Sequence, residues 1–292
     1  MPELSSLNPT GRFTGLAGTY ARFRPSYPAH GIDFIMARCG LGKQSLLVDV
    51  GCGTGIASRL FAARGINVVG IEPNTEMRCA AAAEEPDADS DRLNVTYRQG
   101  RAEATGLDAA IADAVLSAQA FHWFEPVATL AEFHRILKPD GWAILMWNER
   151  DEQDPMTADY GAVIRTATDS AAIEGRRQTR SGDSLRTCPL FRQAEQLTFH
   201  NHQVLDEEGL LGRAFSVSYA PRAANDRQEW ADRLKTVFHH HQRDGTVVLR
   251  YRTSIYVARR IGGQTGENQE VGGMTVIQSQ KSERTFGPFN RR

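Results

Sequence analysis

The sequence has 292 residues, of which 41% are hydrophobic and 24% are charged, a composition typical of a globular protein that buries a core. Its net charge of −1 excludes a global basic field, so we expect neither nucleic acid nor a membrane surface as a partner. The 4 cysteines are widely spaced and form no C-x-x-C pair, which excludes a disulfide framework and indicates reduced thiols in a cytoplasmic protein.

The N-terminal segment has neither the basic nor the apolar region of a signal peptide, so none is expected. Residues 1–28 are rich in Pro, Gly, Arg and aromatic side chains and predict an arm with at most short helical pieces. Strands and helices then alternate, which predicts a parallel, doubly wound sheet. We expect strands at 45–50, 67–72, 93–99, 114–118 and 142–147, helices at 32–39, 56–64, 75–85 and 127–137, and a turn at 139–141.

The pattern changes after residue 148. Residues 149–186 are polar and charged, and we expect a helix and a mobile loop inserted between strands. Further on we expect strands at 194–205 and 246–258 and helices at 207–216 and 224–242. The alternation of apolar and polar side chains from Val247 to Arg252 suits an antiparallel strand. The complete pattern predicts an α/β fold with a seven-stranded, doubly wound sheet, mostly parallel with an antiparallel last strand.

A glycine-rich loop follows the first predicted strand. Gly51, Gly53 and Gly55 stand at every second position, and Glu72 ends the next strand. A tight glycine turn lets the backbone touch a ligand while the acid binds ribose hydroxyls, so this arrangement indicates a nucleoside-bearing cofactor. A dinucleotide fingerprint would need glycine at position 56, which is Ile56, and no Gly-Lys-Ser/Thr follows as in a phosphate loop.

Gly-x-Gly-x-Gly preceded by Asp49 resembles the loop of class I S-adenosylmethionine (SAM)-dependent methyltransferases. Similar stretches follow the family's order over roughly the first half of the chain, at 20–28, 100–103, 117–124 and 135–142. Within the family, the chain resembles the small-molecule branch (methyltransferase type 11), which is similar to trans-aconitate and ubiquinone/menaquinone-type methyltransferases. Residues 150–292 carry no recognised motif.

The resemblance implies a Rossmann-like fold, SAM as cofactor and S-adenosyl-L-homocysteine (SAH) as its product. Asp49 would reach the amino-acid end of SAM, Glu72 both ribose hydroxyls, and Gln119 would begin the segment facing the sulfonium. Asn74 and Met77 would flank the adenine, and Ala102 and Glu103 its edge. The implied cofactor-binding residues are Asp49, Gly51, Cys52, Gly53, Thr54, Gly55, Glu72, Pro73, Asn74, Met77, Ala102, Glu103, Gln119 and Ala120.

Each of these residues also has a purely structural interpretation. The glycines can form a plain strand-to-helix turn, Glu72 can be a solvated strand end, and Asp49 can cap a helix. Phe121, Trp123 and Phe124 can be core residues, which is the interpretation preferred for Phe124. For the N-terminal arm we prefer a lid that folds over the cofactor; the implied lid and substrate residues are Tyr20, Arg24, Tyr27 and Trp123.

Four segments are expected: the arm at 1–30, a SAM-binding core at 31–148, the substrate side at 149–260, and a disordered tail at 261–292. Methyl transfer to a small-molecule acceptor is the leading hypothesis, and a non-catalytic SAM-binding interaction protein is the alternative. The acceptor atom, whether O, N, C or a carboxylate, stays open, as does the oligomeric state.

His122 is the candidate general base, and a structural His122 is the competing interpretation. A carboxylate acceptor would need no base, and Arg22 or Arg24 could hold it. No metal is expected, because His239, His240 and His241 are consecutive and would point to different faces of a helix.

Overall fold

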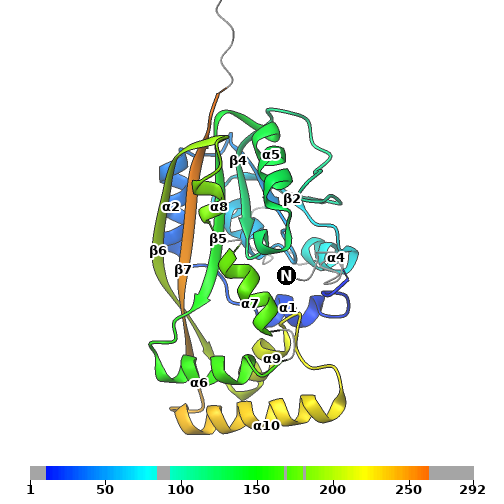
Figure 1. Cartoon of the computed structure of the whole chain (residues 1–292), viewed down its shortest axis with the longest axis vertical. Helices are drawn as coiled ribbons and strands as arrows, with labels where there is room; N and C mark the ends of the chain where they lie inside the picture. The colour runs from blue at the N-terminus through cyan, green and yellow to red at the C-terminus, as the bar shows by residue number, and fades with distance from the viewer. Residues whose placement is uncertain (1–10, 84–92, 168–169, 180–181, 263–292) are drawn as a thin grey trace, which may run out of the picture. The chain divides into compact units, whose positions relative to one another are not determined.

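A computed structural model of the chain describes residues 11–83, 93–167, 170–179 and 182–262. Its centre is a seven-stranded sheet of order β3-β2-β1-β4-β5-β7-β6 (Figure 1). The pairs from β3 to β5 are parallel, whereas β7 is antiparallel to both β5 and β6, so the predicted fold class is confirmed. The strands are β1 Leu46–Val50, β2 Asn67–Ile71, β3 Val95–Arg98, β4 Ala112–Ala118, β5 Leu137–Arg150, β6 Phe191–Leu205 and β7 Val247–Arg260.

Three helix ends show which residues satisfy or terminate the free backbone groups of a helix. Asp154 accepts a hydrogen bond from Thr157 N–H at the start of α6, Asp206 does the same for Gly209 in α9, and Gly40 ends α2 in a left-handed conformation. In the described residues the helices are α1 Ala17–Phe23, α2 Ala29–Cys39, α3 Ile56–Ala62, α4 Thr75–Ala83, α5 Pro126–Ile136, α6 Pro155–Ile164, α7 Ser170–Thr179, α8 Asp183–Arg186, α9 Glu207–Phe215 and α10 Ala224–His241, with a 3₁₀ turn at Phe121–Trp123.

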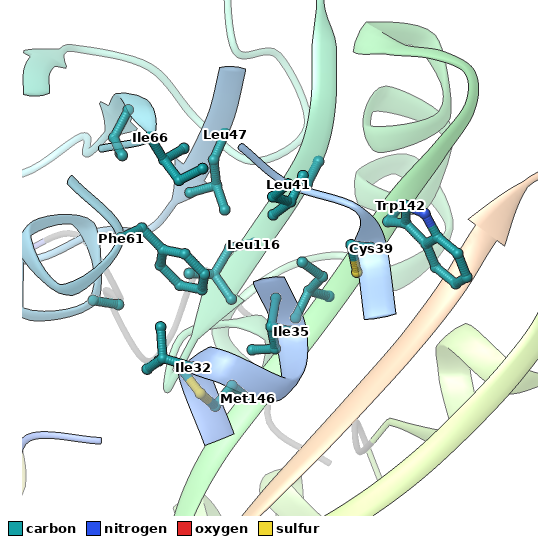
Figure 2. Packing of buried hydrophobic residues seen from close by; sticks show 14 of the residues in the cluster. Ile32, Ile35, Cys39, Leu41, Leu47, Phe61, Ile66, Leu116, Trp142 and Met146 are labelled. Carbon is teal, nitrogen blue, oxygen red and sulfur yellow. The ribbon is translucent and has the colours of Figure 1, made fainter. Parts of the chain in front are cut away.

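Helices cover both faces of the sheet. Because alternate strand residues point to opposite faces, successive residues of the central strands are buried on one face or the other. On one face α2 and α3 cover the strands: Ile32 and Ile35 pack with Leu47, Leu116 and other apolar residues (Figure 2). On the other face α5 supplies Leu130, Phe133 and Ile136. The central strands are therefore apolar on both faces. The polar residues Asp49, Glu72 and Gln119 lie at the carboxyl ends of β1, β2 and β4.

A third apolar cluster lies beyond the sheet's centre, where α6, α9 and α10 come together at one end of β6 and β7 (Figure 1). The prediction for 149–186 was incomplete here. The segment contains α6, α7 and α8, and α6 buries Met156, Tyr160 and Ile164. Although the segment as a whole is polar, α6 places its apolar side chains inside a helical layer that covers β7.

The predicted turn at 139–141 is wrong as a strand boundary, because β5 runs through it. Leu137 pairs with Ala112 and Trp142 pairs with Ala114, so four residues of β5 bulge out opposite a single residue of β4. Asp140 takes a left-handed φ of 63° there. Its carboxylate accepts from Arg192 at 2.6 Å, and its carbonyl accepts from Arg259 at 3.1 Å. The Pro-Asp-Gly sequence therefore bends the strand without ending it.

No helix in the described part of the chain is long and apolar enough to cross a membrane. The expected tail at 261–292 lies outside the described residues from 263 onward, as does the expected helix end at 84–85.

Candidate cofactor and acceptor site

The glycine loop after β1 has three left-handed residues, with φ of 72° at Gly51, 57° at Gly53 and 78° at Gly55. A Cβ atom at Gly51 would lie 2.6 Å from Ala120 Cβ and 2.7 Å from Phe124 Cζ. At Gly55 it would collide with the Tyr97 hydroxyl, whereas at Gly53 it would meet no atom of the described residues within 4 Å. The first and third glycines therefore allow close packing of the loop, and Gly53 exposes its backbone to open space.

Asp49 is the next-to-last residue of β1, directly before this loop, and it is fully buried. Ser58 Oγ donates a hydrogen bond to its Oδ2 at 2.6 Å, while Oδ1 has no hydrogen-bond partner among the described residues. Burial raises the pKa of this carboxyl to about 7, the Ser58 hydrogen bond opposes the shift, and the charge of Glu72 adds to it. A buried carboxylate oxygen without a partner indicates a missing ligand with a donor or a positive charge.

Glu72 follows β2 directly and is only 9% exposed. Its Oε2 accepts from Gly53 N–H at 3.0 Å, and its Oε1 accepts from Asn74 N–H at 2.8 Å. Burial raises the pKa of Glu72, and these two hydrogen bonds hold it down. Because each carboxylate oxygen can accept more than one hydrogen bond, Glu72 fixes the loop and still has capacity for two ligand hydroxyls.

These groups line a pocket with a cavity volume of about 130 Å³ at the carboxyl ends of β1, β2 and β4. This is the edge where open α/β sheets bind ligands. Most of the residues expected from the sequence meet there: Tyr20, Tyr27, Asp49, Gly51, Cys52, Gly53, Thr54, Glu72, Pro73, Met77, Ala102, Glu103, Gln119, Ala120 and Trp123.

Four expected residues are not on the wall of this pocket. Gly55 stands behind the loop at the start of α3. Asn74 faces inward: its Oδ1 accepts from Met77 N–H at 3.0 Å, and its Nδ2 donates to Thr14 Oγ1 at 3.2 Å. Arg24 and His122 line a smaller, neighbouring pocket with a cavity volume of about 20 Å³. Asn74 therefore starts α4 and ties it to the arm.

The N-terminal arm lies against the large pocket, which also has Phe13 on its wall. The Phe13 ring packs edge-on against Tyr20 and Trp123, with centroids 6.0 Å from each. Farther along, Gln203 Nε2 donates to Phe23 O at 3.0 Å and so holds the arm to β6. The arm thus contributes an aromatic wall, in the position that the lid interpretation requires.

His122 is 1% exposed and packs between two indole rings. Trp147 Nε1–H donates to His122 Nδ1 at 3.4 Å, and the Trp123 ring centroid lies 5.0 Å away. Because an indole N–H can only donate, His122 Nδ1 is the acceptor and the neutral ring carries its proton on Nε2. This geometry suits a hydrogen-bond donor better than a proton acceptor.

Sequence reasoning missed part of both pockets. Phe124, preferred as a core residue, contacts the core and also lines the large pocket. Gly100 and Arg101 could have been predicted as pocket residues because they follow the third strand. Nothing in the sequence indicated the residues from α7 and from the segment after α9 that line the smaller pocket. The missed lining residues are Phe13, Ile56, Ala57, Gly100, Arg101, Ala118 and Phe124 in the large pocket and Ile173, Val217, Ser218 and Tyr219 in the small one.

Comparison with known proteins adds a family signal to this geometry. Residues 48–145 match a family model described as a methyltransferase domain. An uncharacterized methyltransferase of Mycobacterium tuberculosis is 35% identical over 152 residues, which cover 52% of this chain and 58% of that protein. A ubiquinone biosynthesis O-methyltransferase of Leptothrix cholodnii is 27% identical over 173 residues, covering 58% of this chain and 73% of the relative.

A solved structure from Anaeromyxobacter dehalogenans, assigned as a type II methyltransferase, has the same fold. It superposes with a TM-score of 0.56 and 22% identity, covering 82% of this chain and 99% of that one. The chain spans about 58% of the length of the mycobacterial relative. The matched region contains the glycine loop, Glu72 and the segment around His122, and it ends inside β5.

Proposed function

We propose that residues 48–145, which match a family model described as a methyltransferase domain, form a class I methyltransferase domain and that the chain transfers a methyl group from SAM to a small-molecule acceptor. The observation that carries this proposal is the buried, unpartnered Asp49 Oδ1 beside Glu72, on either side of the open space at Gly53. Asp49 would meet the cationic amino-acid end of SAM, and Glu72 would meet the ribose hydroxyls in the middle of the molecule.

The charge of the pocket favours SAM over a nicotinamide dinucleotide. Two buried carboxylates face the glycine loop, and Arg101 is the only basic residue among the described residues on the pocket wall. The Arg101 side chain is 80% exposed, so it leaves the inner end of the pocket acidic. A pyrophosphate would meet negative charge there, whereas the cationic amino and sulfonium groups of SAM would meet a counter-charge.

When bound, SAM supplies an activated methyl group on its sulfonium. The chain's own residues then orient the acceptor in line with that group and exclude water. Asp49 would hold the amino-acid end, Glu72 the ribose hydroxyls, and Phe13, Tyr20 and Trp123 would cover the methyl-bearing side. We assign the segment 1–30 to this cover, 31–148 to cofactor binding and 149–260 to the acceptor side.

Several features support a small acceptor. The pocket lined by Arg24 and His122 adjoins the large one, and Phe13, Tyr20, Gln119 and Trp123 line both. Its volume of about 20 Å³ admits only a small group unless the arm moves. The Leptothrix relative bears the name of an O-methyltransferase of ubiquinone biosynthesis, which also agrees with a small organic acceptor.

Replacing Glu72 by alanine is expected to weaken SAM binding by about 1–3 kcal/mol, the usual effect of losing a charge-assisted hydrogen bond. The variant also frees the Gly53 and Asn74 amides that Glu72 now accepts from. Isothermal titration calorimetry with SAM measures the change, and Glu229→Ala, the same change at an exposed glutamate on α10 outside both pockets, is the matched control. Equal affinity of the Glu72 variant and the wild type would refute the ribose assignment.

His122→Asn is expected to lower kcat less than tenfold and to leave the pH profile of kcat/KM unchanged in shape. Asparagine Oδ1 can still accept from the Trp147 indole, so the side chain keeps the bond that the structure shows. Steady-state rates between pH 5.5 and 9 provide the measurement. A 10²- to 10⁴-fold loss with disappearance of a limb near neutrality would instead make His122 a general base.

Formation of SAH distinguishes an enzyme from a non-catalytic SAM-binding protein. The purified chain is incubated with SAM and a mixture of small phenols, amines and carboxylic acids, and mass spectrometry follows SAH and any product 14 mass units heavier. The proposal predicts equal amounts of SAH and methylated product. Tight SAM binding with no acceptor-dependent SAH would support the non-catalytic alternative.

A further inference from the structure

A buried arginine lies next to the small pocket without a carboxylate partner. Arg213, in the last turn of α9, is 6% exposed, and no ion pair links it to an acidic side chain among the described residues. Its Nε donates to Tyr251 OH at 3.1 Å, while Nη1 is buried and has no hydrogen-bond partner in the part of the chain that the structure describes. The C-terminal end of α9 carries a partial negative charge of about half an elementary charge, which compensates only part of the positive charge of Arg213.

Three tyrosines lie near this guanidinium: Tyr160, Tyr219 and Tyr251. Together with Arg213 they are called the Arg213–tyrosine cluster below. Tyr160 is 1% exposed, and its hydroxyl has no hydrogen-bond partner among the described residues. The Tyr251 hydroxyl is already engaged, because it donates to Gln203 Oε1 at 3.3 Å. Two buried donors, Arg213 Nη1 and Tyr160 OH, are therefore left without an acceptor.

The cluster reaches the small pocket through the end of α9. Tyr219 belongs to the cluster and lines that pocket, together with Val217 and Ser218. Arg24 lines it from the arm, and its Nη2 donates to Ser216 O at 3.0 Å. The wall of the small pocket therefore carries the Arg24 guanidinium and the hydroxyls of Ser218 and Tyr219, and it shares four residues with the large pocket. Arg213 and Tyr160 are not on this wall; Tyr219 is the cluster residue that joins them to the pocket.

We propose that Arg213, with Tyr160 and Tyr219, binds a carboxylate group of the methyl acceptor. This inference rests on the proposed function and deepens it by naming the acceptor's chemical class. A buried charge without a partner is costly to folding, whereas a bidentate guanidinium–carboxylate pair satisfies it and selects an anionic ligand. A neutral analogue would leave the same donors unpaired and would bind less well.

The test uses acetate and benzoate as probes, each compared with its amide, at matched ionic strength and with or without saturating SAH. Thermal unfolding of the full chain is expected to shift upward by about 2–4 °C with the acids, once their concentration is several times their dissociation constant. Acetamide and benzamide are expected to give no shift. Because SAH alone gives its own shift, failure of SAM-site binding is seen separately from failure of the carboxylate response.

Variants distinguish a binding role from a structural one. Arg213→Met should unfold, without probes, at the wild-type temperature or above and should lose the carboxylate response, because it removes an unpaired buried charge. Tyr160→Phe should fold like the wild type and show a reduced response. Arg227→Met, the same change at an exposed arginine that packs on Phe215, should respond like the wild type. Equal shifts with acids and amides, or an unchanged response in both cluster variants, would overturn the proposal.

Discussion

Gly53→Val is expected to abolish measurable SAM binding while the chain stays folded. Among the residues that the structure describes, none has an atom within 4 Å of a Cβ at this position, so valine would extend into the space assigned to the cofactor rather than into the core. The left-handed φ of 57° adds a backbone strain of about 1–3 kcal/mol to the variant. Calorimetric titration gives the affinity, and circular dichroism with urea unfolding shows that the fold is retained.

The matched control separates strain from obstruction. Gly40 also has a left-handed φ, of 63°, and open space at its Cβ position, but it ends α2 away from the pocket. Gly40→Val should therefore lose a similar amount of stability and keep its affinity for SAM. If both valine variants bound SAM alike, the pocket at Gly53 would not be the cofactor site.

Asp49→Asn is expected to weaken SAM binding about 10- to 100-fold at pH 8, because it removes the charge from a buried hydrogen-bond acceptor. In the wild type the pKa of this carboxyl is raised to about 7, so SAM must displace a proton at lower pH. Affinity should then rise from pH 5.5 to pH 7.5 and level off. In the variant most of this rise should disappear, with only the contribution of Glu72 left.

The same substitution is expected to stabilise the free protein at alkaline pH. Because the pKa of Asp49 is higher in the folded than in the unfolded chain, the folded chain binds a proton that the unfolded chain has released. The contribution of Asp49 to wild-type stability therefore falls as pH rises from about 4 to about 7, by up to roughly 4 kcal/mol for three pKa units.

Urea unfolding of Asp49→Asn should show a much smaller fall over this range and greater stability at pH 8. Ser58→Ala is the companion control: it removes the hydrogen bond that Asp49 Oδ2 now accepts. It should raise the pKa of Asp49 further and shift the rise in SAM affinity to higher pH. A pH-independent affinity in the wild type would contradict the assignment of Asp49 to the cationic end of SAM.

Much of the large pocket could be predicted because many of its residues follow strand ends in one continuous part of the chain. The glycine loop and Glu72 need only the rule that parallel strands place their carboxyl ends on one edge. Phe13 could not be predicted, since its place against Trp123 depends on how the arm docks. Asn74 was expected to flank the adenine, and the structure adds a role that the sequence did not show: its side chain caps the helix that begins beside it.

The small pocket, proposed above as the acceptor side, was least predictable, because its residues come from elements far apart in sequence. Ile173 of α7, Tyr219 after α9 and Arg24 of the arm meet only in the folded chain. The polar composition of 149–186 hid the buried face of α6, and the Pro-Asp-Gly signal at 139–141 was overridden by sheet pairing on both sides of the bulge. Arg213 carried no sequence signal, because a single arginine in a helix is usually exposed.

Calorimetric titration of the purified chain with SAM, SAH and NAD shows which cofactor the large pocket binds. We expect micromolar binding of SAM and SAH, none of NAD, and release of a proton on SAM binding at pH 6.5 as Asp49 ionises. Binding of NAD without binding of SAM would contradict the assignment of this pocket to SAM.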